Sequence, residues 1–183
     1  MPERRTLVAV IGSGSESHPE LSPALGRWLG LNGYDLINGG GPGVMQAVAK
    51  AFSEVKDRAG LVLGIIPADG PCRTPAERTH HQPPPGYPNP FIDRPIYTHL
   101  HLSGVAGKDP ASRNHIIILS ADLVLALPGG AGTRSEIQLA LEYNKPLLLL
   151  DPHQKWREFA EVAAVTTVDQ AIEWLHSHNR KKI

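Results

Sequence analysis

The chain is poor in cysteine and balanced in charge, and both facts limit what it does. Cys72 is the single cysteine in 183 residues, so no internal disulfide can form, and no candidate base stands near it in the sequence to activate it as a nucleophile. Lysine plus arginine equal aspartate plus glutamate at 18 each, and like charges gather only in the short tail Arg180-Lys181-Lys182. This charge balance argues against nucleic acid as a partner.

Long apolar runs are also missing. The first apolar run, Leu7–Ile11, is too short for a signal peptide or a membrane span, so we expect a cytoplasmic protein that does not bind membranes. A chain of this length can form one domain with a substantial core. We therefore expect a single domain over residues 1–183, with a proline-rich excursion at residues 67–95 and a basic tail at residues 179–183.

What the chain does contain is an alternation of short apolar runs with helical patterns. Helices are expected just after Gly43, where Val44, Val48 and Phe52 form one stripe, and over Ile137 to Tyr143. Several of the runs are apolar at every position, as strands of a parallel sheet covered on both faces require. The pattern predicts an α/β fold with a doubly wound parallel sheet of about seven strands and helices on both faces. The expected strands are Leu7–Ile11, Leu36–Ile37, Leu61–Ile66, Ile96–Leu100, Leu123–Leu127, Leu147–Leu150 and Val165–Val168.

A glycine-rich turn between a strand and a helix is the most informative feature. It follows the run Leu123–Leu127 and reads Pro128, Gly129, Gly130, Ala131, Gly132, Thr133. Glycines let the backbone approach a ligand closely, and the start of the following helix offers unpaired N–H groups and the positive end of its dipole. The turn is therefore expected to hold an anion, most simply a phosphate.

Related glycine motifs do not fit this turn. A Walker A loop ends in Gly-Lys-Ser/Thr, whereas Gly132 is followed by Thr133 and Arg134. The dinucleotide fingerprint lacks its last glycine at every candidate position, so neither NAD nor FAD is expected. Two further turns, Gly12-Ser13-Gly14-Ser15 and Gly39-Gly40-Gly41-Pro42-Gly43, follow the first two strands. Because such turns meet at the carboxyl edge of a parallel sheet, the three turns predict a shared ligand cleft.

Four segments together resemble the LONELY GUY family and its relatives, the molybdenum cofactor carrier proteins. They are Gly39 to Met45, Gly64-Ile65-Ile66-Pro67, Ser112-Arg113-Asn114 and Pro128 to Glu136, and the likeness covers roughly residues 6 to 175. The resemblance implies a Rossmann-like sheet and assembly as a dimer or a larger form such as a tetramer. In the hydrolases of the family it implies cleavage of nucleoside 5′-monophosphates to free base and ribose 5-phosphate.

Glu136 has two interpretations. Cleavage of an N-glycosidic bond develops positive charge on the ribose, which a nearby carboxylate stabilises, and Glu136 matches a catalytic position of the family. Alternatively, Thr133 and Glu136 form a capping box, in which the glutamate only satisfies a backbone N–H at the helix start. The sequence leaves both open.

Arg113 is the second candidate for the site, as a clamp on phosphate, although a solvated or helix-pairing arginine is the alternative. In the hydrolases the matching arginine lies within Met-His-x-Arg-Lys, whereas this chain reads Ala111-Ser112-Arg113-Asn114-His115. The missing histidine and lysine favour the cofactor-carrier branch. If the protein is a hydrolase, Glu136 and Arg113 are its expected catalytic residues.

The proline-rich excursion holds nine of the 17 prolines, and a loop of this length is either a lid over the cleft or a stiff surface segment. Its His80-His81 pair, and His99 and His101 on the expected next strand, lack a third ligand, so no metal site is expected.

The sequence thus leaves two main classes of function, and a sensor of a nucleotide-derived signal, which would bind its ligand in the same way, is a third. We favour a carrier that binds the molybdenum cofactor, with molybdenum enzymes as possible partners, over a nucleoside 5′-monophosphate phosphoribohydrolase. In either case the ligand is a phosphorylated small molecule. Its expected contacts are Gly12, Ser13, Gly14, Ser15, Gly39, Gly40, Gly41, Gly43, Met45, Arg113, Asn114, Pro128, Gly129, Gly130, Ala131, Gly132, Thr133 and Glu136.

Overall fold

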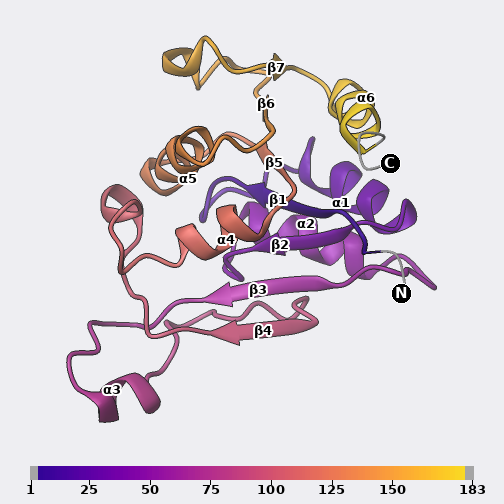
Figure 1. The fold of residues 1–183 in the computed structure, drawn as a ribbon. Helices are drawn as coiled ribbons and strands as arrows, with labels where there is room; N and C mark the ends of the chain where they lie inside the picture. Colours follow the sequence, from indigo (N-terminus) through magenta and orange to yellow (C-terminus); the bar gives the residue numbers. More distant parts are fainter. Residues whose placement is uncertain (1–3, 180–183) are drawn as a thin grey trace.

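A computed structural model describes residues 4–179, which form one seven-stranded parallel sheet covered by helices (Figure 1). The strand order is β4-β3-β2-β1-β5-β6-β7. The chain forms, in order, β1 (Leu7–Ile11), α1 (Ser22–Leu31), β2 (Asp35–Asn38), α2 (Val44–Ser53), β3 (Val62–Ile66), α3 (Pro75–Thr79), β4 (Arg94–Tyr97), the 3₁₀ turn η1 (Gly104–Ala106), α4 (Asn114–Ser120), β5 (Leu123–Ala126), α5 (Ala131–Glu142), β6 (Leu147–Leu150), the 3₁₀ turn η2 (Arg157–Phe159), β7 (Ala164–Val165) and α6 (Val168–Asn179). This confirms the predicted doubly wound α/β fold.

The apolar residues of β1 explain why helices cover both faces. Val8 and Val10 belong to a core with α1, α2 and α6, whereas Ala9 and Ile11 belong to a second core with α4 and α5. Successive side chains of a strand point to opposite faces, so a strand that is apolar at every position must be buried on both sides. Burial of both faces of the sheet therefore explains the continuous apolar runs in the sequence.

The element boundaries differ from the expected ones in the second half of the chain. β4 spans Arg94–Tyr97 rather than the expected Ile96–Leu100, and just after it Thr98 donates to the Ile66 carbonyl from both its N–H and its hydroxyl, at 2.9 Å each. Val168 begins α6 instead of ending a strand. A capping box sets this start, since Thr167 Oγ1 accepts from the Gln170 N–H and Gln170 Oε1 accepts from the Thr167 N–H, both at 3.3 Å.

The order in which the chain fills the sheet reverses direction between β1 and β5. β1 is paired with β2 on one side and with β5 on the other, so the connections after β1 and β5 leave in opposite directions. In open parallel sheets this switch point forms a crevice at the carboxyl ends of the strands.

No helix within residues 4–179 is long and apolar enough to cross a membrane. Most of the basic tail expected at residues 179–183 lies outside the described residues.

Candidate functional site

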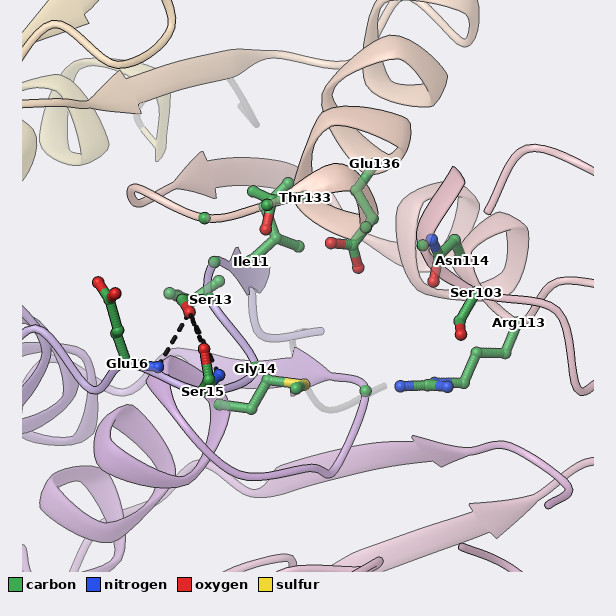
Figure 2. Close-up of a pocket in the computed structure, with 18 of the residues that line it drawn as sticks. Ile11, Ser13, Gly14, Ser15, Glu16, Ser103, Arg113, Asn114, Thr133 and Glu136 are labelled. Atoms are coloured by element: carbon green, nitrogen blue, oxygen red, sulfur yellow. Dashed lines mark hydrogen bonds between the residues drawn. The ribbon is translucent and has the colours of Figure 1, made fainter. Parts of the chain in front are cut away.

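A pocket of about 420 Å³ opens at the carboxyl ends of β1, β2 and β5, at the switch point of the sheet (Figure 2). The three glycine-bearing turns that the sequence singled out all contribute to its wall. Residues expected at the site that line the pocket are Gly12, Ser13, Gly14, Ser15, Gly39, Met45, Arg113, Asn114, Gly129, Gly130, Gly132, Thr133 and Glu136. Gly40, Gly41, Gly43 and Pro128 do not line it but belong to the turns behind its wall, and Ala131, which also does not line it, begins α5.

The turn after β5 presents the amino end of α5 to the pocket. The helix begins at Ala131, six residues earlier than the expected Ile137, and its N-cap Gly130 provides no side-chain cap. Within the described residues, the backbone N–H groups of Ala131, Gly132 and Thr133 make no hydrogen bond. Three free N–H groups at the positive end of a helix dipole are suited to accept an anion.

Gly129 and Gly130 have different roles in this turn. A Cβ atom at Gly129 would collide with the Thr133 side chain and come within 2.9 Å of the Ser13 backbone nitrogen, whose N–H donates to the Pro128 carbonyl at 3.1 Å. A Cβ atom at Gly130 would meet nothing within 4 Å. Gly129 therefore allows the turns after β1 and β5 to pack together, whereas Gly130 leaves open space in the pocket.

The turn after β2 is locked to the turn after β1. Gly43 has a φ of 67°, which favours glycine, and a side chain there would collide with the Ser13 carbonyl. The Val44 N–H donates to that same carbonyl at 2.9 Å. Buried Asn38 supports the turn from inside, accepting from the Gly40 N–H at 2.8 Å. These contacts fix the positions of two walls of the pocket.

Ser13 stabilises its own turn. Its Oγ accepts from the Ser15 N–H at 3.2 Å and from the Glu16 N–H at 2.9 Å, as Figure 2 shows. It does not cap the next helix, because α1 begins only at Ser22.

Arg113 enters the pocket from the start of α4, and its guanidinium points toward the end of β2 (Figure 2). The residue is only 7% exposed, and its Nε is buried without a hydrogen-bond partner among the described residues. A Cβ atom at Gly39 would lie 2.5 Å from Nη2, so this glycine makes room for the arginine. The alternative of a solvated arginine is wrong. A buried cation with an unpaired donor is suited to hold an anionic ligand.

Glu136 lies on the first turns of α5, and its carboxyl group faces the pocket (Figure 2). Burial raises the pKa of this carboxyl from 4.5 to about 7, and the positive charge of Arg113 opposes the shift. The capping-box interpretation of Thr133 and Glu136 is wrong, because both residues lie inside the helix and Gly130 is the N-cap. A local capping role therefore does not explain this glutamate.

Several pocket residues carry no sequence motif. They are Val10, Ile11, Glu16, Tyr87, Ser103, Gly104 and Lys155. Tyr87 comes from the proline-rich excursion, and Lys155 from the connection after β6. The run of prolines indicated a stiff segment but not which of its residues would reach the cleft.

The histidines of the excursion bond to nearby backbone. Nδ1 of His80 lies 2.9 Å from the Ala76 carbonyl oxygen, and Nδ1 of His81 lies 2.8 Å from that of Arg78. His99 and His101 follow β4 rather than lying on it, which corrects the expected strand position. No group of three or more His, Cys, Asp or Glu side chains within residues 4–179 is arranged to hold a metal ion.

The parallel sheet, its switch-point pocket and the amino end of α5 together define an α/β protein of the Rossmann-like class. Residues 5–179 match the SLOG cluster4 family, and the chain belongs to that family.

Three known proteins show where the chain lies in the wider superfamily. It is 28% identical to the cytokinin riboside 5′-monophosphate phosphoribohydrolase of Rhodococcoides fascians over 86% of this chain and 72% of that protein. The molybdenum cofactor binding protein of Rippkaea orientalis is 29% identical, with a TM-score of 0.72 over 95% of this chain and 97% of that one. The Moco carrier protein of Chlamydomonas reinhardtii is 25% identical, with a TM-score of 0.73 over 97% and 99% of the two chains. The resemblance to the LONELY GUY-like superfamily, near its cofactor-carrier branch, is thus confirmed.

Proposed function

We propose that the protein binds a phosphate-bearing small molecule and that this ligand is the molybdenum cofactor, which the protein carries without converting it. One observation supports this proposal above the others. The free N–H groups at the start of α5 and the buried guanidinium of Arg113, with its unpaired Nε, face the same pocket. Together they provide several hydrogen-bond donors for an anion.

The ligand would span the pocket. Its phosphate would accept hydrogen bonds from the backbone between Gly129 and Thr133, with Arg113 nearby. The pterin part would lie along the turns Gly12 to Ser15 and Gly39 to Gly43, where Gly39 and Met45 line the wall. A volume of about 420 Å³ is in the range of small-molecule sites.

The two solved structures described above support the carrier assignment, because they are named for binding or carrying this cofactor and match nearly the whole chain. The sequence supports it as well, since the lysine and histidine of the hydrolase motif around Arg113 are absent. Cytoplasmic location, assembly into a dimer or tetramer, and delivery to molybdenum enzymes belong to the same proposal.

A phosphoribohydrolase is the second candidate, and Glu136 supports it. A carboxyl with a pKa of about 7 is suited to proton transfer near neutral pH, and this one faces the pocket instead of capping its helix. Under this alternative Glu136 would stabilise the positive ribose, and Arg113 would hold the substrate. The Rhodococcoides fascians relative carries the corresponding activity in its name.

Direct binding tests the carrier proposal. Purified protein is titrated anaerobically with the molybdenum cofactor and, separately, with AMP, and binding is followed by fluorescence and calorimetry. We expect the cofactor to bind at least tenfold more tightly than AMP. Replacing Arg113 by Gln should weaken cofactor binding, whereas replacing the exposed Arg27 of α1 by Gln serves as a matched control. Tighter binding of AMP would contradict the proposal.

A further inference from the structure

Tyr87 of the proline-rich excursion lies between the glycine turn after β2 and Arg113. The Arg113 Cζ atom lies 5.4 Å from the centre of the Tyr87 ring, which is within cation–π distance. The other neighbour of the ring is Gly41, where a Cβ atom would collide with the phenol. The absence of a side chain at Gly41 therefore provides the space that the ring occupies.

The segment that carries Tyr87 is fixed to the same glycine turn. The Asn89 N–H donates to the Gly40 carbonyl at 2.7 Å, and the Asn89 side-chain amide donates to the Gly41 carbonyl at 2.9 Å. Asn89 is only 4% exposed. Near α3 the excursion extends away from the sheet (Figure 1), but from Tyr87 to Asn89 it is anchored against the pocket.

Arg113 needs such support because, among the described residues, its guanidinium makes no ion pair or hydrogen bond and its Nε is buried without a partner. A carboxylate partner would hold the cation but would occupy its N–H donors. An aromatic ring attracts the guanidinium without an ion pair, so no carboxylate occupies the N–H donors that a ligand would use. The Tyr87 ring thus stabilises the charge without competing with a ligand.

We infer that Tyr87 is a positioning residue, which holds the guanidinium of Arg113 in the pocket with its donors free for an anion. This role is distinct from that of a lid, because Tyr87 would act in the absence of ligand. The inference rests on the proposed function in one respect: the anion that Arg113 would bind is the ligand proposed above.

The arrangement is tested without ligand by measuring the pKa of Glu136 with carboxyl ¹³C NMR. Arg113 lowers this pKa, so a variant in which the guanidinium leaves the pocket should show a higher value. We expect Arg113→Gln, Tyr87→Leu and Gly41→Ala each to raise it, and Tyr87→Phe to preserve it. Adding Tyr87→Leu to Arg113→Gln should have no further effect, because both act through the same charge.

Tyr97→Leu is the matched control, since Tyr97 is half exposed on β4 and outside the pocket. The inference is overturned if folded Tyr87→Leu and Gly41→Ala leave the pKa at the wild-type value, or if Arg113→Gln itself does not raise it. Gly41→Ala provides a second route should Tyr87→Leu fail to fold, because it displaces the ring while keeping all its atoms.

The consequence for binding is measured separately with the molybdenum cofactor. We expect Tyr87→Leu to weaken its affinity about tenfold and Tyr87→Phe to restore it. Wild-type affinity in Tyr87→Leu would overturn the role in binding. If the wild type binds no cofactor, the proposed function is wrong, and the NMR titration still decides whether Tyr87 positions Arg113.

Discussion

Glu136 and Arg113 face one pocket from two different helices, α5 and α4, and no hydrogen bond joins them within the described chain (Figure 2). The arginine lowers the pKa of the glutamate, but burial has the larger effect and brings the pKa to about 7. Near neutral pH the protein therefore exists with Glu136 in both protonation states, and the charge of the pocket changes with pH.

The first prediction concerns stability. The native pKa of about 7 exceeds the ordinary value of 4.5, so the native state binds a proton more strongly than the unfolded state. The free energy of unfolding should fall by about 1 to 3 kcal/mol as the pH rises from 5 to 8. Replacing Glu136 by Gln should remove this loss, making the variant more stable than the wild type at pH 8. Urea titrations across this range measure both proteins.

One outcome would contradict this prediction. If the difference in unfolding free energy between wild type and Glu136→Gln is the same at pH 5 and pH 8, the raised pKa is wrong. Replacing Glu54 by Gln is a suitable control, because that glutamate is exposed to solvent at the carboxyl end of α2.

The second prediction separates the two glycines at the start of α5. Gly130→Val should fold normally, because a Cβ atom at this position meets nothing within 4 Å and φ is −110°, and it should abolish anion binding by filling the pocket. Gly129→Val should instead destabilise the fold by collision with Thr133. Thermal melts and sulfate or cofactor titrations measure the two effects. A folded Gly130→Val variant with full affinity would disprove the anion site at this turn.

The third prediction concerns assembly. We expect a dimer or a tetramer, as the family resemblance implies, and closed symmetric assemblies are the usual form of such oligomers. Light scattering at micromolar concentration measures the mass directly, to be compared with 19.8 kDa for one chain. A monomeric mass over the whole concentration range would contradict the prediction.

The central strands β1, β5 and β6 were predictable because they are apolar on both faces, and this pattern depends only on local sequence, whereas β4 is exposed along its length. The boundaries of some helices and strands were less predictable from the sequence. The start of α5 was missed because Ala131 to Glu136 carry few apolar residues, and the helix is recognised from its core face only at Ile137. The capping box at Thr167 and Gln170 was a readable signal that the expected strand Val165–Val168 obscured.

The site was predictable where glycines mark the turns. The structural roles of individual glycines were less predictable, because these roles depend on contacts between segments that are distant in the sequence. Gly39 and Gly41 were expected to approach a ligand, yet they make room for Arg113 and Tyr87. Tyr87 is separated by more than forty residues in sequence from the turn it contacts, so no local pattern indicated its place in the pocket.

The most direct test of the carrier account is the release of free base from nucleoside 5′-monophosphates. Wild-type protein is incubated with a panel that includes AMP, and any base formed is separated by chromatography. A carrier has no turnover, so we predict that no base appears above the rate without protein. Release of base by the wild type, reduced by orders of magnitude in Glu136→Gln with little change in nucleotide affinity, would contradict the account and establish the hydrolase.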